Sequence, residues 1–247
     1  PQSLGIVFAL DVTGSMGEIP RIMAIQQLPV FMKTLVDCRI ADPQVLFMAV
    51  GDAVSDHAPL QVGQFESTAE LMDQWLTWSF LEGGGGMLGQ ESYELGMYFL
   101  AMHTEMDCMV KRNKRGYLFM TGDELPYPTL SRHVVDTVIG DRLDEDLTCE
   151  EIVAELQKTF IPFFIIPDRA RAKRCERRWR DLLGDHVHLG LRDALAGGLA
   201  DVDVAALGVG VGVEGNDLGA RLAGLVEGVA DRGGVVGRHH EGTDALL

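Results

Sequence analysis

The sequence lacks the signals that mark several large classes of protein. Its cysteines are few and scattered, without a CxxC pair: Cys38, Cys108, Cys149 and Cys175. Neither a zinc site nor a disulfide framework is indicated, and the pattern fits a reducing compartment. There is also no charged-then-apolar leader and no apolar run long enough to cross a bilayer, so we predict a cytoplasmic protein without a membrane partner. Because the first residue is Pro1 and not Met, the sequence leaves open whether a leader or an upstream domain has been removed.

Basic residues are scarce as well. The chain of 247 residues contains 21 Lys and Arg against 37 Asp and Glu, a formal net charge of −16. This balance argues against general affinity for nucleic acid, because phosphate contacts need a basic surface. A third of the basic residues nevertheless lie between Arg169 and Arg180. A solvated helix face explains such a run, and an alternative hypothesis is that this face docks an acidic partner or another subunit.

The length fits one large α/β domain followed by a tail. From Arg192 onward the composition shifts to Ala, Gly, Val and Asp. We therefore predict a domain over residues 1–191 and a C-terminal extension over residues 192–247, partly helical and with a loose end.

Short apolar runs predict the strands of this domain. They are Gly5–Leu10, Val45–Val50, Leu60–Phe65, Gly116–Met120, Phe160–Ile166 and His186–Leu191. The third run is expected to pair antiparallel with the second, as a hairpin. Between the strands lie helical patterns, among them one opened by Ser67 that should bury Trp75 and Trp78, and one over Glu91 to His103.

Oxygen-bearing side chains follow directly on the first strand. Asp11, Thr13 and Ser15 alternate, so in a near-extended loop one carboxylate and two hydroxyls can converge on one point. Such a hard-oxygen set suits Mg²⁺, Mn²⁺ or Ca²⁺. The set is incomplete by itself, and it leaves coordination positions for water or for a partner.

The segment DVTGSM resembles the metal-ion-dependent adhesion site (MIDAS) of von Willebrand factor A (vWA) domains, whose motif is Asp-x-Ser/Thr-x-Ser. Further landmarks follow in the order used by a bacterial branch of that family: VLFMAVGD at Val45–Asp52, QF at Gln64 and Phe65, LEGGGGMLGQES at Leu81–Ser92, and GYLFMTGDE at Gly116–Glu124. The resemblance covers roughly Leu4 to Leu191. It implies a Rossmann-like, doubly wound α/β fold with a mostly parallel central sheet, one antiparallel edge strand, helices on both faces, and a metal at the carboxyl ends of the strands.

Two positions depart from the family's pattern. The family usually has Thr-Asp-Gly after its central strand, whereas this chain has Thr-Gly-Asp, which makes Asp123 the predicted second acid with Glu124 behind it. A turn or a helix cap is the alternative for Asp123. In the glycine-rich loop, Gly86 and Met87 stand where the family supplies a threonine ligand. Either Glu91, expected at the start of a helix, or a water bridge would replace that ligand.

Two functions compete for these residues. The resemblance implies a protein-interaction module and no enzyme: Asp11, Thr13, Ser15 and Asp123 hold Mg²⁺, and a partner's carboxylate fills the vacant position. Bacterial members often serve as partners of AAA-type ATPases or of other multi-protein assemblies. The alternative is a Mg²⁺-dependent phosphohydrolase of the haloacid-dehalogenase-like type with Asp11 as nucleophile. Thr13 disfavours it, because that chemistry uses a second aspartate there as acid and base.

Overall fold

The structure is a computed structural model of the chain. It describes residues 2–17, 19–22, 35, 40, 42–68, 74–75, 78–82, 89–167 and 169–190. The predicted extension over residues 192–247 and the loop positions Gly86 and Met87 lie outside these ranges, and the domain boundary stays a prediction.

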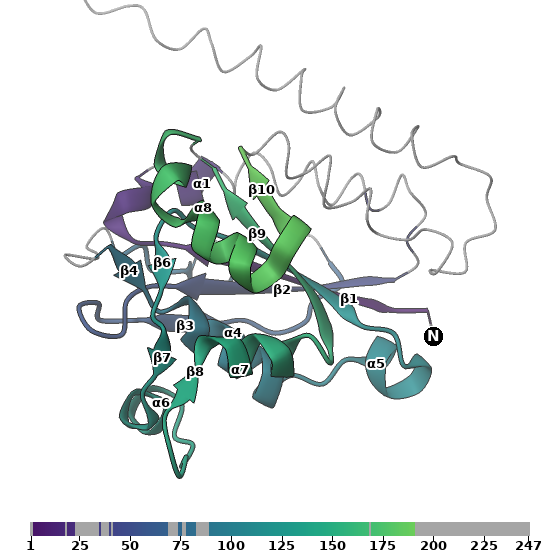
Figure 1. Cartoon of the computed structure of the whole chain (residues 1–247). Coiled ribbons are helices and arrows are strands. Elements are labelled where there is room, and N and C mark those ends of the chain that lie inside the picture. Colours follow the sequence, from purple (N-terminus) through teal and green to yellow (C-terminus); the bar gives the residue numbers. More distant parts are fainter. Residues whose placement is uncertain are drawn as a thin grey trace, which may run out of the picture.

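A six-stranded sheet forms the centre of the fold, in the order β10-β9-β5-β1-β2-β3 (Figure 1). Its strands are β1 (Leu4–Asp11), β2 (Pro43–Val50), β3 (Leu60–Val62), β5 (Gly116–Thr121), β9 (Phe160–Ile166) and β10 (Val187–Leu189). Neighbouring strands pair in parallel except β2 with β3, which pair antiparallel. The predicted mostly parallel sheet with one antiparallel edge strand is therefore confirmed.

The two central strands, β1 and β5, are the most completely buried part of the sheet. Every residue of β1 and of β5 is buried, as expected for parallel strands that are covered on both faces. The edge strand β3 is shorter than predicted and ends at Val62. Pairing with β2 resumes only as an isolated bridge between Val45 and Glu66.

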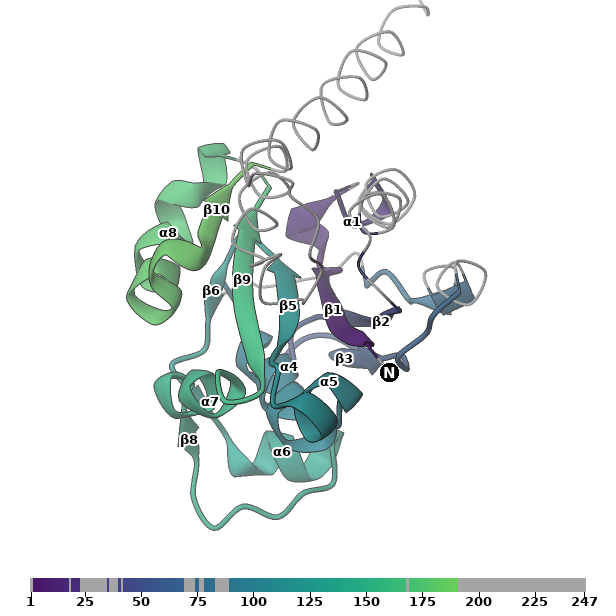
Figure 2. The same ribbon diagram turned by 90° about the vertical axis from the view of Figure 1, so that its right-hand side faces the viewer.

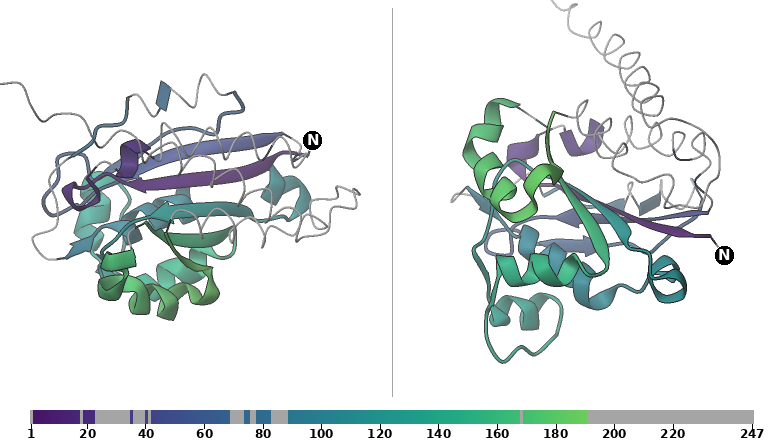
Figure 3. Two further views of the ribbon diagram at one scale, coloured as in Figure 1. Left: turned by 90° about the horizontal axis from the view of Figure 1, so that it is seen from above. Right: turned by 45° about the vertical axis from the view of Figure 1, so that its right-hand side comes forward.

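Helices cover both faces of the sheet. The described helical segments are η1 (Gly14–Met16), α1 (Ile19–Ile22), α4 (Tyr93–His103), α5 (Asp107–Arg112), α6 (Arg132–Val138), α7 (Cys149–Leu156), α8 (Arg169–Leu183) and η3 (Gly184–His186). Residues of α4, α7 and α8 share one hydrophobic core with Val7 and Ala9 of β1. On the opposite face, Ile19 of α1 packs near Leu10 and Ala49 (Figure 2 and the left view of Figure 3).

Two short strand pairs lie outside the main sheet. β4 (Gln90–Glu91) pairs with β6 (Leu125–Pro126), and β7 (Thr129–Leu130) pairs with β8 (Leu147–Thr148). The first pair corrects an expectation, because Glu91 belongs to a strand and the helix begins only at Tyr93.

The prediction that both tryptophans are buried is wrong for one of them. Trp75 is partly buried, but the side chain of Trp78 is 69% exposed. Within the described ranges, no helix is long and apolar enough to cross a membrane.

Candidate metal-binding site

The candidate site lies where β1 and β5 end. The register pairs Leu10 with Thr121, so the two parallel strands finish side by side at one edge of the sheet. Asp11 is the last residue of β1, and Asp123 follows β5 by two residues. Ligands of open α/β sheets bind at this edge, outside the carboxyl ends of the strands.

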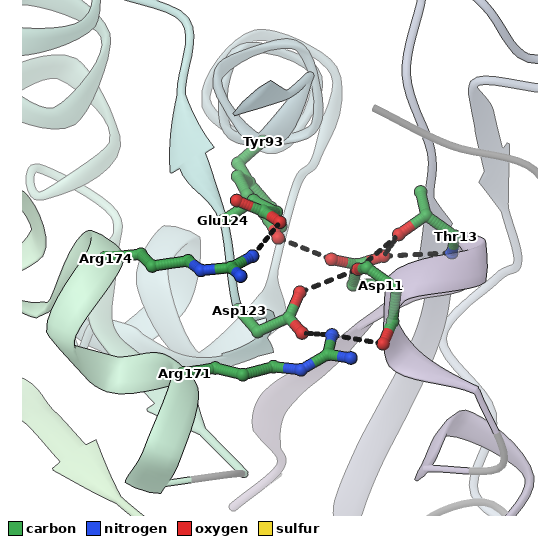
Figure 4. A network of polar contacts seen from close by, with 8 residues as sticks. Asp11, Thr13, Tyr93, Asp123, Glu124, Arg171 and Arg174 are labelled. Atoms are coloured by element: carbon green, nitrogen blue, oxygen red, sulfur yellow. Dashed lines mark hydrogen bonds and ion pairs between the residues drawn. The ribbon is translucent and has the colours of Figure 1, made fainter. Parts of the chain in front are cut away.

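Four of the predicted ligands lie in one continuous series of polar contacts. Asp11 Oδ1 accepts hydrogen bonds from the backbone N–H of Thr13 at 2.9 Å and from its Oγ1 at 2.6 Å. Thr13 Oγ1 lies 3.3 Å from Ser15 Oγ, which donates to Asp123 Oδ1 at 2.7 Å. Figure 4 shows this network from close by. The structure thus brings Asp11, Thr13, Ser15 and Asp123 together.

The spacing of these oxygens suits a small hard cation. With Mg²⁺–oxygen distances of about 2.1 Å, neighbouring octahedral ligands lie about 3 Å apart. The contacts between the side-chain oxygens of Asp11, Thr13, Ser15 and Asp123 run from 2.6 to 3.3 Å. In the described ranges, no group of three or more His, Cys, Asp or Glu side chains could hold a metal ion. A cation here would therefore depend on the two hydroxyls in addition to the two carboxylates.

Asp11 carries a buried charge at the centre of the site. Its side chain is fully buried, and burial raises its pKa to about 6, although hydrogen bonds from Thr13 and Tyr93 oppose the shift. The hydroxyl of Tyr93, the first residue of α4, donates to Asp11 Oδ2. Both carboxylate oxygens are thus engaged, so Asp11 is held in one orientation.

Asp123 is paired with an arginine that the sequence did not place at the site. Arg171 Nη1 donates to Asp123 Oδ2 and also to the backbone carbonyl of Ser15 (Figure 4). The Asp123 side chain is 1% exposed and that of Arg171 is 37% exposed. The guanidinium therefore joins the loop after β5 to the loop after β1. The helical-cap alternative for Asp123 is not what the structure shows, since its carboxylate bonds Ser15 and Arg171.

Glu91 lies near this network without joining it. Its side chain is buried, and neither carboxylate oxygen has a hydrogen-bond partner. Burial, together with the negative charges of Asp11 and Asp52, raises the pKa of Glu91 to about 9. The carboxyl group is therefore largely protonated at neutral pH. The structure does not join Glu91 to Asp11, Thr13, Ser15 or Asp123 by a hydrogen bond.

A further buried acid, Asp52, follows β2 at the same edge. Asp52 Oδ1 accepts hydrogen bonds from the Val54 N–H at 3.1 Å and from the Tyr127 hydroxyl at 3.0 Å, and Oδ2 accepts one from Ser55 at 2.7 Å. Val54 and Ser55 belong to the same loop as Asp52, and Tyr127 belongs to the loop after β6. Its position at the end of β2 was predictable, but its donors come from a turn, from distant Tyr127 and, at 3.5 Å, from the hydroxyl of Ser92.

Comparisons with known proteins support the fold alone. No protein-family model matches the chain, and no curated protein matches it. Among solved structures, it is similar to the pilus adhesin SpaC from Lactobacillus rhamnosus GG in its open conformation, with TM-score 0.51 and 8% identity over 93% of this chain. It is also similar to proximal thread matrix protein 1 from the mussel byssus, solved with a zinc-occupied MIDAS motif, with TM-score 0.50 and 13% identity over 83% of this chain.

The chain covers 30% of the adhesin and 46% of the mussel protein, less than half of either. At these identities the likeness concerns backbone architecture and not ligands or partners. The fold is thus of the vWA-like type: a mostly parallel central sheet with one antiparallel edge strand and helices on both faces.

Proposed function

We propose that this chain is a vWA-like interaction module that binds a divalent cation through Asp11, Thr13, Ser15 and Asp123 and recognises a partner's carboxylate through that cation. The observation that carries the proposal is the 2.7 Å hydrogen bond between Ser15 and Asp123, residues 108 positions apart. It links two strand-end loops into one oxygen-rich cluster. Membership of the bacterial branch of the vWA family, with a MIDAS-type site, is part of the proposal.

The donor set also suggests how the module would recognise a partner. Two carboxylates and two neutral hydroxyls would supply only four oxygen ligands to a hard dication such as Mg²⁺, Mn²⁺ or Ca²⁺, which would leave coordination positions for a further oxygen. Thr13 and Asp11 fix each other's orientation, while Ser15 and Asp123 do the same across the loops. Either Glu91 or a water molecule would supply a further oxygen.

The partner in this proposal is a protein that presents an acidic residue, with an AAA-type ATPase or another multi-protein assembly as the candidate. Nucleic acid and membranes are not proposed as partners, because the chain carries a net charge of −16. A cytoplasmic location remains part of the proposal. It is supported by Cys108, Cys149 and Cys175, which are all buried free thiols.

The phosphohydrolase alternative receives no support from the geometry. Asp11 would have to present a carboxylate oxygen to a phosphorus atom, but Oδ1 accepts two hydrogen bonds from Thr13 and Oδ2 accepts one from Tyr93. A general acid two residues after the nucleophile is replaced by the Thr13 hydroxyl, which has no acidic proton to give at neutral pH. We therefore propose no catalytic residue.

Isothermal titration of the whole chain with Mn²⁺ and Mg²⁺ tests the cation site. We expect saturable binding of one ion, and at least about tenfold weaker binding in Asp11→Asn, which keeps the size of the side chain and removes one ligand charge. Asp136→Asn is the matched control, since Asp136 is exposed on α6, away from the strand ends. Absence of binding to the wild-type chain, or equal binding to Asp11→Asn, would contradict the proposal.

A further inference from the structure

Helix α8 supplies a positive charge to the candidate site. Arg171, in the first turn of that helix, donates to Asp123 Oδ2 and to the Ser15 carbonyl, so one guanidinium contacts both loops that carry the proposed ligands. The carboxylate it pairs with is 1% exposed. In such a place solvent screens charges poorly, and each added or removed charge matters more than at the surface.

Other ion pairs of α8 are of a different kind. Arg178 pairs with Glu150 at 2.6 Å, and the Glu150 side chain is 58% exposed. Arg174 is itself 69% exposed and lies 3.6 Å, beyond hydrogen-bond distance, from Glu124, whose side chain is 10% exposed. Exposed pairs of this type contribute little to stability. Arg171 is set apart from them because its guanidinium donates hydrogen bonds both to buried Asp123 and to the carbonyl of Ser15.

A count of formal charges shows what Arg171 does to a bound cation. Among the described residues of the hydrogen-bonded cluster, Asp11 and Asp123 carry two negative charges and Arg171 carries one positive charge, a sum of −1. A divalent cation changes this sum to +1, which favours an incoming anion. Without Arg171 the same cation would leave the cluster neutral, and the attraction for a partner's carboxylate would be lost.

We propose that Arg171 is a built-in counter-charge that weakens binding of the divalent cation and keeps the cation-loaded site attractive to a carboxylate. This inference rests on the proposed function, because it assigns a role in the same site. Arg171 acts on the cation through its charge, so it is an electrostatic selectivity residue and not a cation ligand.

The alternative role is purely structural: Arg171 could hold Asp123 in the orientation that a cation needs. The contacts favour the electrostatic role. Arg171 engages Oδ2, whereas Oδ1 is held independently by the hydroxyl of Ser15 at 2.7 Å. Loss of the guanidinium therefore leaves Asp123 with one fixed oxygen. It also removes the electrostatic repulsion between the positive side chain of Arg171 and a dication bound to the same carboxylate.

Three variants separate the two roles. Arg171→Gln removes the charge and keeps a polar side chain, and Arg171→Lys keeps the charge but replaces the rigid guanidinium, whose Nη1 reaches both acceptors, with a flexible ammonium group. Arg178→Gln is the matched control, because it makes the same change on the same helix at the exposed pair with Glu150. For each, we would measure the Kd of Mn²⁺ by isothermal titration. The Mn²⁺-loaded chain would then be titrated with an end-blocked Gly-Asp-Gly tripeptide, the carboxylate probe.

The two measurements should change in opposite directions. In Arg171→Gln we expect Mn²⁺ to bind at least about tenfold tighter and the tripeptide at least about tenfold weaker. Arg171→Lys and Arg178→Gln should both stay within about threefold of the wild-type chain. In EDTA, Arg171→Gln should also have a lower Tm, since buried Asp123 loses its ion pair, and Mn²⁺ should raise that Tm more than it raises the wild-type value.

Each other outcome has a definite meaning. If the wild-type chain binds Mn²⁺ but Arg171→Gln binds it no tighter, the counter-charge is wrong and the cation site stands. If Mn²⁺ binding is weaker in both Arg171→Gln and Arg171→Lys, Arg171 only positions Asp123, which also overturns the inference. If the wild-type chain binds no Mn²⁺, the proposed function fails and this inference fails with it. Should Arg171→Gln not fold, weaker binding in Arg171→Lys alone would overturn the counter-charge.

Discussion

The ring of Tyr93 occupies the space that a side chain at position 122 would need. A Cβ atom built on Gly122 would lie 2.6 Å from Cζ and 2.7 Å from Cε1 of Tyr93, closer than non-bonded carbons approach. The same tyrosine donates its hydroxyl hydrogen to Asp11. The order Thr-Gly-Asp thus has a physical reason: glycine must stand beside the ring, and the acid follows it at Asp123.

Gly122→Ala should therefore destabilise the protein. The added methyl group cannot be accommodated by a flexible chain end, because Tyr93 is fully buried and also packs edge-on against Phe164 and Trp179. We expect a loss of about 1–3 kcal/mol in the free energy of unfolding, measured by urea denaturation in EDTA. An unchanged midpoint would show that the Tyr93 ring can move, and the explanation of the Thr-Gly-Asp order would be lost.

The N-terminal cap of α7 was predictable from sequence. Thr148 Oγ1 accepts a hydrogen bond from the backbone N–H of Glu151, and the Glu151 side chain accepts one from the backbone N–H of Thr148. Thr148→Ala removes one of these two reciprocal hydrogen bonds, so we expect Tm to fall by about 2–4 °C in a thermal unfolding experiment. Thr137→Ala, at an exposed position within α6, is the control and should leave Tm unchanged or slightly higher. Equal changes in the two variants would argue against the cap.

The sequence predicts those features that depend on neighbours along the chain or on strand direction. The uncharged run of β1, the alternation of Asp11, Thr13 and Ser15, and the apolar run that precedes Asp123 are all local patterns. Parallel pairing then brings the two strand ends together, so the meeting of Ser15 with Asp123 is predictable from the amino-acid sequence.

What the sequence could not predict are contacts made by side chains that reach the site from elements packed on the sheet. Arg171 is one of seven basic residues in its segment, and nothing local marks it as the one that bonds Asp123. Tyr93 resembles an ordinary core aromatic in its local pattern. The helical pattern predicts a helix start at Glu91. It misses strand β4, because the two-residue pairing of β4 with β6 depends on a partner strand far along the chain.

Glu94 should make the stability of the cation-free protein depend on pH. Its side chain is 2% exposed, and burial raises its pKa from 4.5 to about 8. Because the folded state then binds more protons than the unfolded state between these values, stability is highest at low pH and falls as the pH rises through this window. The direction is opposite to that of a salt-bridged carboxylate.

Glu94→Gln removes this titration while keeping the shape of the side chain. We expect the variant to be more stable than the wild-type chain by about 2 kcal/mol or more at about pH 8.5, and to differ much less at about pH 5. Urea denaturation in EDTA at the two pH values measures the difference. Asp11 and Glu91 titrate in both proteins, so their contributions cancel in the comparison. A difference that does not grow with pH would contradict the prediction.

Binding of a cation should release a proton if Glu91 approaches it. Burial first, and then the charges of nearby acids, raise the pKa of Glu91 to about 9, so at about pH 7.5 its carboxyl group holds a proton. A carboxylate must be deprotonated to bind a metal ion, so the proton would leave as the ion enters and Mn²⁺ affinity would rise with pH. Asp11, whose pKa is about 6, is mostly ionised at that pH and adds little.

Buffers of different ionisation enthalpy measure that proton directly. In titrations of the wild-type chain with Mn²⁺ at about pH 7.5, we expect the observed heat to differ between MOPS and Tris by an amount that corresponds to release of roughly one proton. Glu91→Gln should abolish most of the difference, since the amide has no proton to lose. If Mn²⁺ binds the wild-type chain with the same heat in both buffers, a water molecule and not Glu91 takes the place of the threonine ligand. The buried, unpartnered carboxyl group of Glu91 would then be a neutral element of the core beside Asp11.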